Sequence, residues 1–362
     1  MAASRVMNSS RMELLNLGPS PIGTRCGSLL HPIEVADQST LTNMFLIGGA
    51  NSSETMSDVV SFQIEREGGC LNWEKRECTG DFPGRYEAAS FVPSSHPSDI
   101  FVFGGGYEEG TYNDLWKLST RESRWEELEQ KGPTPSERTL YSVAHHGDCL
   151  YVWGGGRGQT DPVRDTHVYI FDANSLTWEM TPSKGELIQP RQGHAMVYSE
   201  GNLLVHAGMQ EDTLLDDLFQ FDLATSEWRE IRSIGLRPEA RAAHSAVLVP
   251  SSSGAQITGM IIFGGLAIAG ALNDFWCLHT KSWVWERIEY LGKPPAPRLD
   301  HSMCLCTSSS SVLDLTESSC EDSPPTHSPI ASPLQKHISV VVFGGMDTTG
   351  TVLKDVFLLK LS

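Results

Sequence analysis

The chain has 362 residues, of which 40% are hydrophobic, and it contains 9 Trp, 13 Phe and 8 Tyr. This apolar content is enough for a packed core and excludes wholesale disorder. The formal net charge of −18 disfavours a broad electrostatic contact with nucleic acid or anionic lipid. With 33 Gly and 20 Pro, the composition favours short strands and frequent turns over long helices.

We expect neither a signal peptide nor a membrane span in the N-terminal segment. Residues 1–10 are polar and are expected to be flexible, and no apolar run in the chain approaches the length of a spanning helix. The eight cysteines are scattered without C-x-x-C spacing, which favours reduced thiols. We expect an intracellular protein with no integral membrane insertion.

Short apolar runs that end in paired glycines recur along the chain. Five runs carry both glycines, and in a sixth, LLVHAG, the first is replaced by Ala207. We interpret the glycines as structural, because glycine is used where the backbone needs a positive φ or where neighbouring chains approach too closely for a side chain. The repeated glycines are Gly48, Gly49, Gly104, Gly105, Gly154, Gly155, Gly208, Gly264, Gly265, Gly344 and Gly345.

Three further residue types recur with the glycines. Trp is expected to bury apolar area between neighbouring units, and Arg and Asp are expected to tie neighbouring units by charge-assisted hydrogen bonds. An Asp follows each second Gly by 9 or 10 residues at Asp58, Asp114, Asp165, Asp217, Asp274 and Asp355. Trp follows at Trp73, Trp125, Trp178, Trp228 and Trp285. Units begin near Arg25, Arg85, Arg138, Arg191, Arg241 and Arg298.

Each unit of about fifty residues contains four short apolar segments, which predict four β-strands. One such sheet cannot bury both of its faces, so the units must stack. The Arg, Gly-Gly, Asp and Trp pattern resembles kelch repeats and covers essentially the whole chain. The predicted fold is therefore all-β: a single six-bladed kelch β-propeller spanning residues 11–362.

The last unit lacks its Trp segment, because the chain stops at Ser362. The N-terminal sequence RMELLNLGPSPIGTR parallels RWEELEQKGPTPSER, with Met12 in the place of Trp125. We therefore predict that residues 11–17 pair with the strand at 355–361 and close the ring, which removes exposed sheet edges.

One segment, 307–336, departs from the repeat. It is rich in Ser, Pro and Thr, with few large apolar residues, and is predicted to be a disordered insertion. Its Ser-Pro dipeptides offer possible phosphorylation sites at Ser323, Ser328 and Ser332, although an idle loop is the plainer interpretation.

Loops on a rigid scaffold commonly carry binding residues. The loops after the second strands of three units combine carboxylates with Tyr, Met and Arg, which suits a basic, partly apolar partner. The candidate partner-binding residues are Tyr107, Glu108, Glu109, Arg157, Arg164, Met209, Glu211, Asp212 and Asp216. Solvated turns are the alternative for each of them.

An enzymatic function has weaker support. His194, His244 and His301 each stand three residues after a unit's Arg, so they could converge on the central channel and suggest a metal. The other units hold different residues there, and no nucleophile elbow is present. We predict no catalytic residues, no cofactor and no metal.

Longer stretches, including GGANSSETMSDV, VRDTHVYIFDANSLTW and APRLDHSMC, resemble the family of Rab GTPase effectors with kelch motifs. The resemblance implies a cytoplasmic protein, peripherally associated with endosomes, that binds a GTP-bound late-endosomal Rab. It also implies a role in returning mannose 6-phosphate receptors to the trans-Golgi network, and contact with a phosphoinositide kinase. We expect a monomer.

Two other functions remain open at this stage. One is a substrate-recognition propeller for a ubiquitin ligase, and the other is a metalloenzyme.

Overall fold

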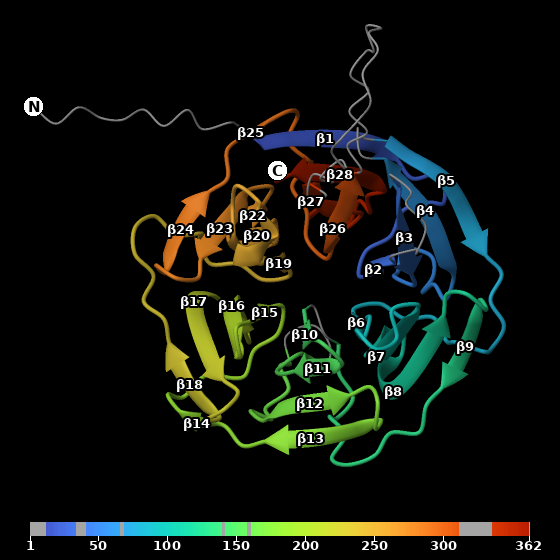
Figure 1. The fold of residues 1–362 in the computed structure, drawn as a ribbon. Helices are drawn as coiled ribbons and strands as arrows, with labels where there is room; N and C mark the ends of the chain where they lie inside the picture. The colour runs from blue at the N-terminus through green and yellow to red at the C-terminus, as the bar shows by residue number, and fades with distance from the viewer. Residues whose placement is uncertain are drawn as a thin grey trace, which may run out of the picture.

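A computed structural model of the chain describes residues 12–33, 41–65, 69–139, 142–157, 161–310 and 335–361. Six mainly antiparallel sheets stand around a central axis as the blades of a propeller (Figure 1). Apart from one 3₁₀ turn, η1 (Ser251–Ser253), the regular elements within these ranges are strands. The six-bladed all-β prediction is confirmed.

The first three blades follow the chain in order. Blade 1 contains β2 (Leu29–Ile33), β3 (Leu41–Ile47), β4 (Val59–Glu65) and β5 (Gly69–Arg76). Blade 2 contains β6 (Ala89–Phe91), β7 (Asp99–Tyr107), β8 (Gly110–Ser119) and β9 (Arg124–Glu127). Blade 3 contains β10 (Ala144–His146), β11 (Cys149–Val152), β12 (Val168–Asp172) and β13 (Thr177–Thr181).

Blades 4 and 5 carry short additions. Blade 4 contains β15 (Ala195–Ser199), β16 (Asn202–Gln210), β17 (Thr213–Asp222) and β18 (Glu227–Glu230), with β14 (Lys184–Gly185) at its outer edge. Blade 5 contains β19 (Ser245–Val249), β20 (Gly259–Phe263), β23 (Phe275–His279) and β24 (Val284–Arg287). A small hairpin, β21 (Leu266–Ala267) and β22 (Gly270–Ala271), extends from blade 5.

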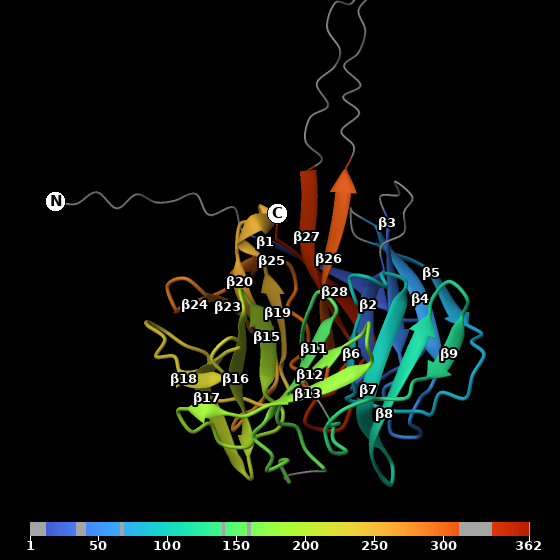
Figure 2. The same ribbon diagram turned by 60° about the horizontal axis from the view of Figure 1, so that its bottom comes forward.

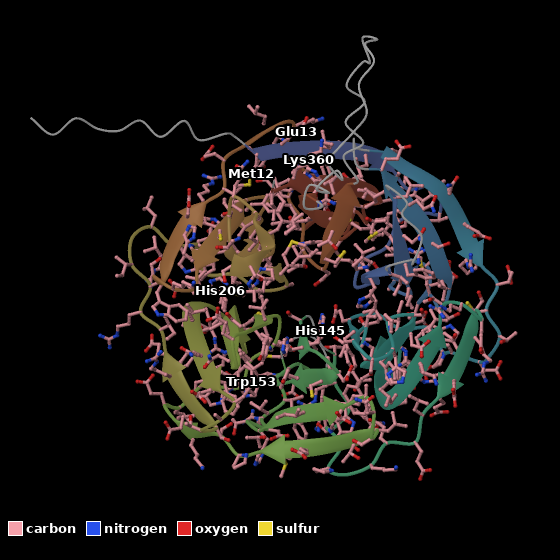
Figure 3. All side chains as sticks on the ribbon, viewed as in Figure 1. Met12, Glu13, His145, Trp153, His206 and Lys360 are labelled. Carbon is pink, nitrogen blue, oxygen red and sulfur yellow. The ribbon has the colours of Figure 1, made fainter. Side chains whose placement is uncertain are left out.

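Blade 6 joins the two ends of the chain. It contains β26 (Ser302–Ser310), β27 (Gln335–Phe343), β28 (Asp355–Lys360) and, as its outer strand, β1 (Met12–Pro19). The strand β25 (Tyr290–Leu291) lies outside β1. Leu14 pairs with Leu359, and the Lys360 Nζ donates to Glu13 Oε2 at 3.0 Å (Figure 3). The predicted closure of the ring is confirmed.

The alternation of β1 explains why this strand seals the blade. Met12 and Leu14 are buried in the core shared by blades 5 and 6, together with Ile338, Val340 and Leu359. Glu13, between them, faces solvent and is 53% exposed. The strand therefore contributes apolar burial on one face and an ion pair on the other.

The boundaries of the insertion differ from the prediction. Residues 307–310 continue β26, and residues 335–336 begin β27, so a strand pair extends into the segment that was predicted to be disordered. Register continues from Ser302 opposite Phe343 to Ser310 opposite Gln335. The phosphorylation candidates Ser323, Ser328 and Ser332, and residues 1–10, lie outside the described residues.

Tryptophans lie at interfaces between blades. Trp73 stacks on Phe62 of its own blade at 4.1 Å between ring centroids and meets Phe343 of blade 6. Trp178 lies against Phe103 of the preceding blade at 4.8 Å, and Trp228 meets Trp153 in the same way. These three interfaces thus bury aromatic area from two blades, which helps to hold the ring together.

Candidate functional site

The two faces of the ring carry different loops. The turns between the second and third strands of each blade form one face, together with the segments that lead to the six repeated arginines. We call this the Arg face. The hairpins β7–β8 and β16–β17 project from it, while β26 and β27 rise from the opposite face (Figure 2).

The repeated arginines form the rigid base of the Arg face. Each arginine side chain is at most 2% exposed, and its Nη1 donates to the carbonyl of the first residue of the Gly-Gly pair in its own blade. Its own carbonyl accepts a hydrogen bond from the second glycine of the preceding blade, as in Gly49 N to Arg85 O at 2.8 Å. Six such links run around the ring without a break.

The structure corrects the predicted role of the Arg and Asp pairs. The ion pairs lie within single blades, as in Arg85 to Asp114 at 2.7 Å and Arg241 to Asp274 at 2.8 Å. The backbone of each arginine, not its side chain, contacts the preceding blade. Blade 3 departs from the pattern, because Arg138 and Asp165 are 3.8 Å apart and Asp165 instead accepts from Tyr169.

The glycine pairs lie where the backbone is crowded, and Gly48 is an example. Its φ is +58°, and a Cβ there would lie 2.7 Å from the Arg85 carbonyl oxygen. Ala207, in the degenerate sixth copy, adopts the same left-handed conformation at φ 58°. A side chain at this point therefore carries backbone strain that glycine avoids.

A further recurring glycine escaped the sequence analysis. Gly80, Gly132, Gly185 and Gly292 each approach the carbonyl of an outer-strand residue of the next blade, within 2.2 to 2.5 Å of where a Cβ would be. The contacted carbonyls belong to Trp125, Trp178, Trp228 and Leu14. The signal was present, because these glycines stand five or six residues before the repeated arginines.

The innermost strands enclose a central cavity of about 1070 Å³. Its polar walls bridge neighbouring blades: Ser28 Oγ lies 2.8 Å from Ser302 Oγ, and His31 Nε2 lies 2.7 Å from Ser90 Oγ. His145 lies at the edge of this central opening (Figure 3). The cavity is thus lined by groups that join blades.

The three histidines considered for a metal do not converge in the channel. His194 packs on Trp153 and His301 on Phe263, while His244 Nε2 lies 3.0 Å from His206 Nδ1 between blades 4 and 5. Only one of the three, His301, lines the cavity. Throughout the described ranges, no group of three or more His, Cys, Asp or Glu side chains could hold a metal ion.

The buried histidines predict a pH-dependent stability. Burial, and then the charge of Arg241, lower the pKa of His206 to about 3, below its ordinary value near 6.5. Between these values the unfolded chain binds more protons than the folded one, so stability falls as the pH falls, by about 1.4 kcal/mol per pH unit for one histidine.

His206→Phe isolates this contribution, because Phe103, Phe263 and Phe343 stand at the equivalent place in other blades. We expect the variant to fold. Between pH 6 and 4, its free energy of unfolding, measured with urea, should depend less steeply on pH than that of the unmodified chain, by the slope that one proton contributes. A slope equal to that of the unmodified chain would show that His206 titrates normally in the folded state.

The cysteine thiols in the part of the chain that the structure describes are not arranged for nucleophilic chemistry. Burial raises the pKa of Cys26, Cys70 and Cys277 to about 12, with Asp300 and Glu87 adding to the shift at Cys26. A thiol with so high a pKa remains protonated at neutral pH and is a poor nucleophile.

The predicted partner-binding residues all lie on the Arg face but in three separate blades. Glu108 and Glu109 form the turn between β7 and β8, beside Tyr107, which stacks on Tyr112 at 4.6 Å. Glu211 and Asp212 form the corresponding turn between β16 and β17, near Met209 and Asp216. Arg157 and Arg164 are exposed in the blade 3 loop between β11 and β12.

Comparison with known proteins agrees with this architecture. A family model described as the KLHDC2/KLHL20/DRC7 Kelch-repeats domain matches residues 35–253. The chain belongs to the kelch-repeat family. Its kelch propeller is similar over most of its length to a Mus musculus protein named Rab9 effector protein with kelch motifs, at 34% identity over 93% of this chain and 89% of the relative.

Two other relatives match smaller portions of the chain. The Homo sapiens Rab9 effector protein with kelch motifs is 39% identical over 56% of this chain and 53% of the relative. Acyl-CoA-binding domain-containing protein 4 of Arabidopsis thaliana is 27% identical over 68% of this chain and 37% of the relative.

Proposed function

We propose that this kelch propeller is a non-catalytic effector that binds a Rab GTPase in its GTP-bound form through the Arg face. The observation that carries the proposal is the 34% identity, over 93% of the chain, to a protein named for Rab9 and its kelch motifs. The proposal includes peripheral association with endosomes, where a Rab effector promotes return of mannose 6-phosphate receptors to the trans-Golgi network.

The architecture supports binding. The six arginines fix the bases of the hairpins, so the exposed turns are presented by a rigid frame, which reduces the entropy lost on association. Several titratable side chains of the described residues have structural roles, since Arg85 pairs with Asp114, His31 bonds to Ser90 of the next blade, and burial raises the pKa of the Cys26 thiol. No helix in the described part of the chain has the length and apolarity needed to cross a bilayer.

The net charge of −18 indicates what kind of surface the partner presents. A basic partner surface would be steered toward the carboxylates of the Arg face, with an association rate that falls as salt rises. Steering alone does not select a nucleotide state, since that selection requires contact with the switch segments that the γ-phosphate orders.

A pull-down against a panel of Rab GTPases, each loaded with a non-hydrolysable GTP analogue or with GDP, tests the proposal. We expect retention of Rab9 in the GTP-analogue form and little in the GDP form. Equal recovery of the two forms, or recovery of no Rab, would contradict the effector function. In a separate pull-down from a cell lysate, retention of a phosphoinositide kinase would add a second partner to the proposed function.

A further inference from the structure

The exposed apolar side chains of this molecule are unevenly distributed around the ring. Large hydrophobic residues that are exposed lie only between residues 180 and 291 in the described chain: Met180, Leu187, Ile234, Leu236, Ile268 and Leu291. The described parts of blades 1 and 2, and the strands β26 to β28, contribute none. Clustered exposed apolar residues on a soluble scaffold mark a contact surface more often than single ones do.

Ile268 is the most exposed of these residues. It is 93% exposed in the turn of the β21–β22 hairpin, where Leu266 pairs with Ala271. The sequence from Gly264 to Asn273, GGLAIAGALN, contains no charged side chain, whereas the corresponding turn of every other blade contains at least one. Blade 5 therefore projects an apolar hairpin from the Arg face.

Leu236 lies in the segment between the β16–β17 and β21–β22 hairpins, and it is 82% exposed. The next residue, Arg237, pairs with Asp216 of β17 at 3.2 Å. At the end of the same segment, the Ala242 N donates to Leu266 O at 3.0 Å, and Leu266 N donates back at 2.7 Å. These contacts tie the segment that carries Leu236 to the β16–β17 hairpin of blade 4 through Arg237 and to the β21–β22 hairpin of blade 5 through Ala242.

Carboxylates stand on the blade 4 side of this apolar surface. Glu211 and Asp212 are exposed in the β16–β17 turn, and Asp216 is 41% exposed beside Arg237. We call Leu236, Ile268, Glu211 and Asp212 the blade 4–5 patch. Apolar residues with charges at one edge are the arrangement of an interface whose central contacts are desolvated and whose rim is polar.

We propose that the blade 4–5 patch is where the GTP-bound Rab docks, with its ordered switch surface on Ile268 and Leu236 and a basic edge against Glu211 and Asp212. This inference rests on the proposed function. Nucleotide discrimination needs contacts that form only with the ordered switches, and desolvated apolar contacts supply this better than screened surface charges. The acidic edge, on a chain of net charge −18, selects a basic partner edge.

Blade 2 provides a matched control. Glu108 and Glu109 occupy the turn between β7 and β8 in the same way that Glu211 and Asp212 occupy the turn between β16 and β17. No large apolar side chain in the described parts of blade 2 is exposed. The two turns thus have the same charge and the same place in a blade. They differ because exposed large apolar residues, Leu236 and Ile268, accompany only the blade 4 turn.

Binding of the GTP-analogue form of Rab9 is measured for the unmodified chain, Ile268→Asp, Leu236→Asp, the double variant E211K/D212K and the double control E108K/E109K. We expect each apolar variant to weaken binding by about thirtyfold or more. E211K/D212K should slow association and reduce its dependence on salt, and E108K/E109K, which changes the same charge on the same face, should do both to a smaller extent. All positions are exposed, so melting temperatures should agree within a few degrees.

The outcomes separate the two proposals. If the unmodified chain does not prefer the GTP-analogue form, the proposed function fails. If it does prefer that form and Ile268→Asp and Leu236→Asp bind normally, or E108K/E109K loses as much affinity, the blade 4–5 patch is not the docking site. Self-association of the chain that Ile268→Asp abolishes, with Rab binding retained, would assign the patch to a second copy and overturn the inference.

Discussion

Removal of residues 1–19 is expected to abolish cooperative folding. Without β1, the edge of β28 is left unpaired, and the core around Leu359 and Ile338 loses Met12 and Leu14. An open edge strand beside an uncovered apolar core favours aggregation. We expect the truncated chain to be largely insoluble, or to melt more than about 10 °C lower than the full chain and with a broad transition. Circular dichroism melting and light scattering provide the measurement.

Point variants on β1 separate the role of the strand from a general effect of truncation. Leu14→Ala removes a side chain that is 3% exposed, and we expect a loss of about 2 to 5 kcal/mol. Glu13→Gln changes the exposed partner of Lys360, and we expect less than about 1 kcal/mol. If Leu14→Ala were as stable as Glu13→Gln, β1 would not be part of the folded core.

Arg241→Ala is expected to be one of the most destabilising single changes in the chain. Arg241 is fully buried, and its loss leaves the Gly264 carbonyl without this donor and Asp274, 13% exposed, with the indole of Trp276 as its remaining side-chain partner. Burial would raise the pKa of Asp274, but the hydrogen bond and charge of Arg241 hold it below its ordinary value. We expect a loss of about 3 to 5 kcal/mol in urea unfolding.

A double-mutant cycle checks that the pair acts as a unit. Arg241→Ala with Asp274→Ala should cost clearly less than the sum of the two single changes, because neither buried charge is then left unpaired. The exposed Arg237, whose side chain is 60% exposed and pairs with Asp216, is the control, and Arg237→Ala should cost under about 1 kcal/mol. Additive losses at Arg241 and Asp274 would contradict a coupled buried pair.

Much of the fold could be predicted because the repeated residues have roles that depend mainly on their own blade and its neighbour. The glycine pair and the outer-strand Trp each recur in five of the six blades with the same role, so their spacing predicted the repeat and the six blades. The alignment of Met12 with Trp125 predicted the closing strand for the same reason. The boundaries of the insertion were wrong because the pairing of Ser308 with His337 depends on the register already set by Ser302 and Phe343.

The sequence could not show whether a residue contacts its neighbour through its side chain or its backbone, nor in which direction the side chain points. The Arg and Asp spacing suggested ties between blades, whereas the ion pair lies within a blade and the arginine backbone forms the tie. The histidines at one repeat position suggested a shared channel, but side chains such as His194 and His244 point between blades.

The exposure of the blade 4–5 patch is likewise a tertiary property. Nothing local distinguishes Ile268 from the buried Ile261 and Ile262 of the preceding strand except its place in a turn between two short strands. The uncharged sequence GGLAIAGALN was the available signal, and it gains meaning only when compared with the charged turns of the other five units.

Calorimetric titration of the unmodified chain with Rab9, loaded in parallel with a non-hydrolysable GTP analogue and with GDP, tests the effector account most directly. The account predicts saturable binding of the GTP-analogue form and binding of the GDP form that is at least about tenfold weaker. Equal affinity for the two forms, or no heat of binding with either, would contradict it.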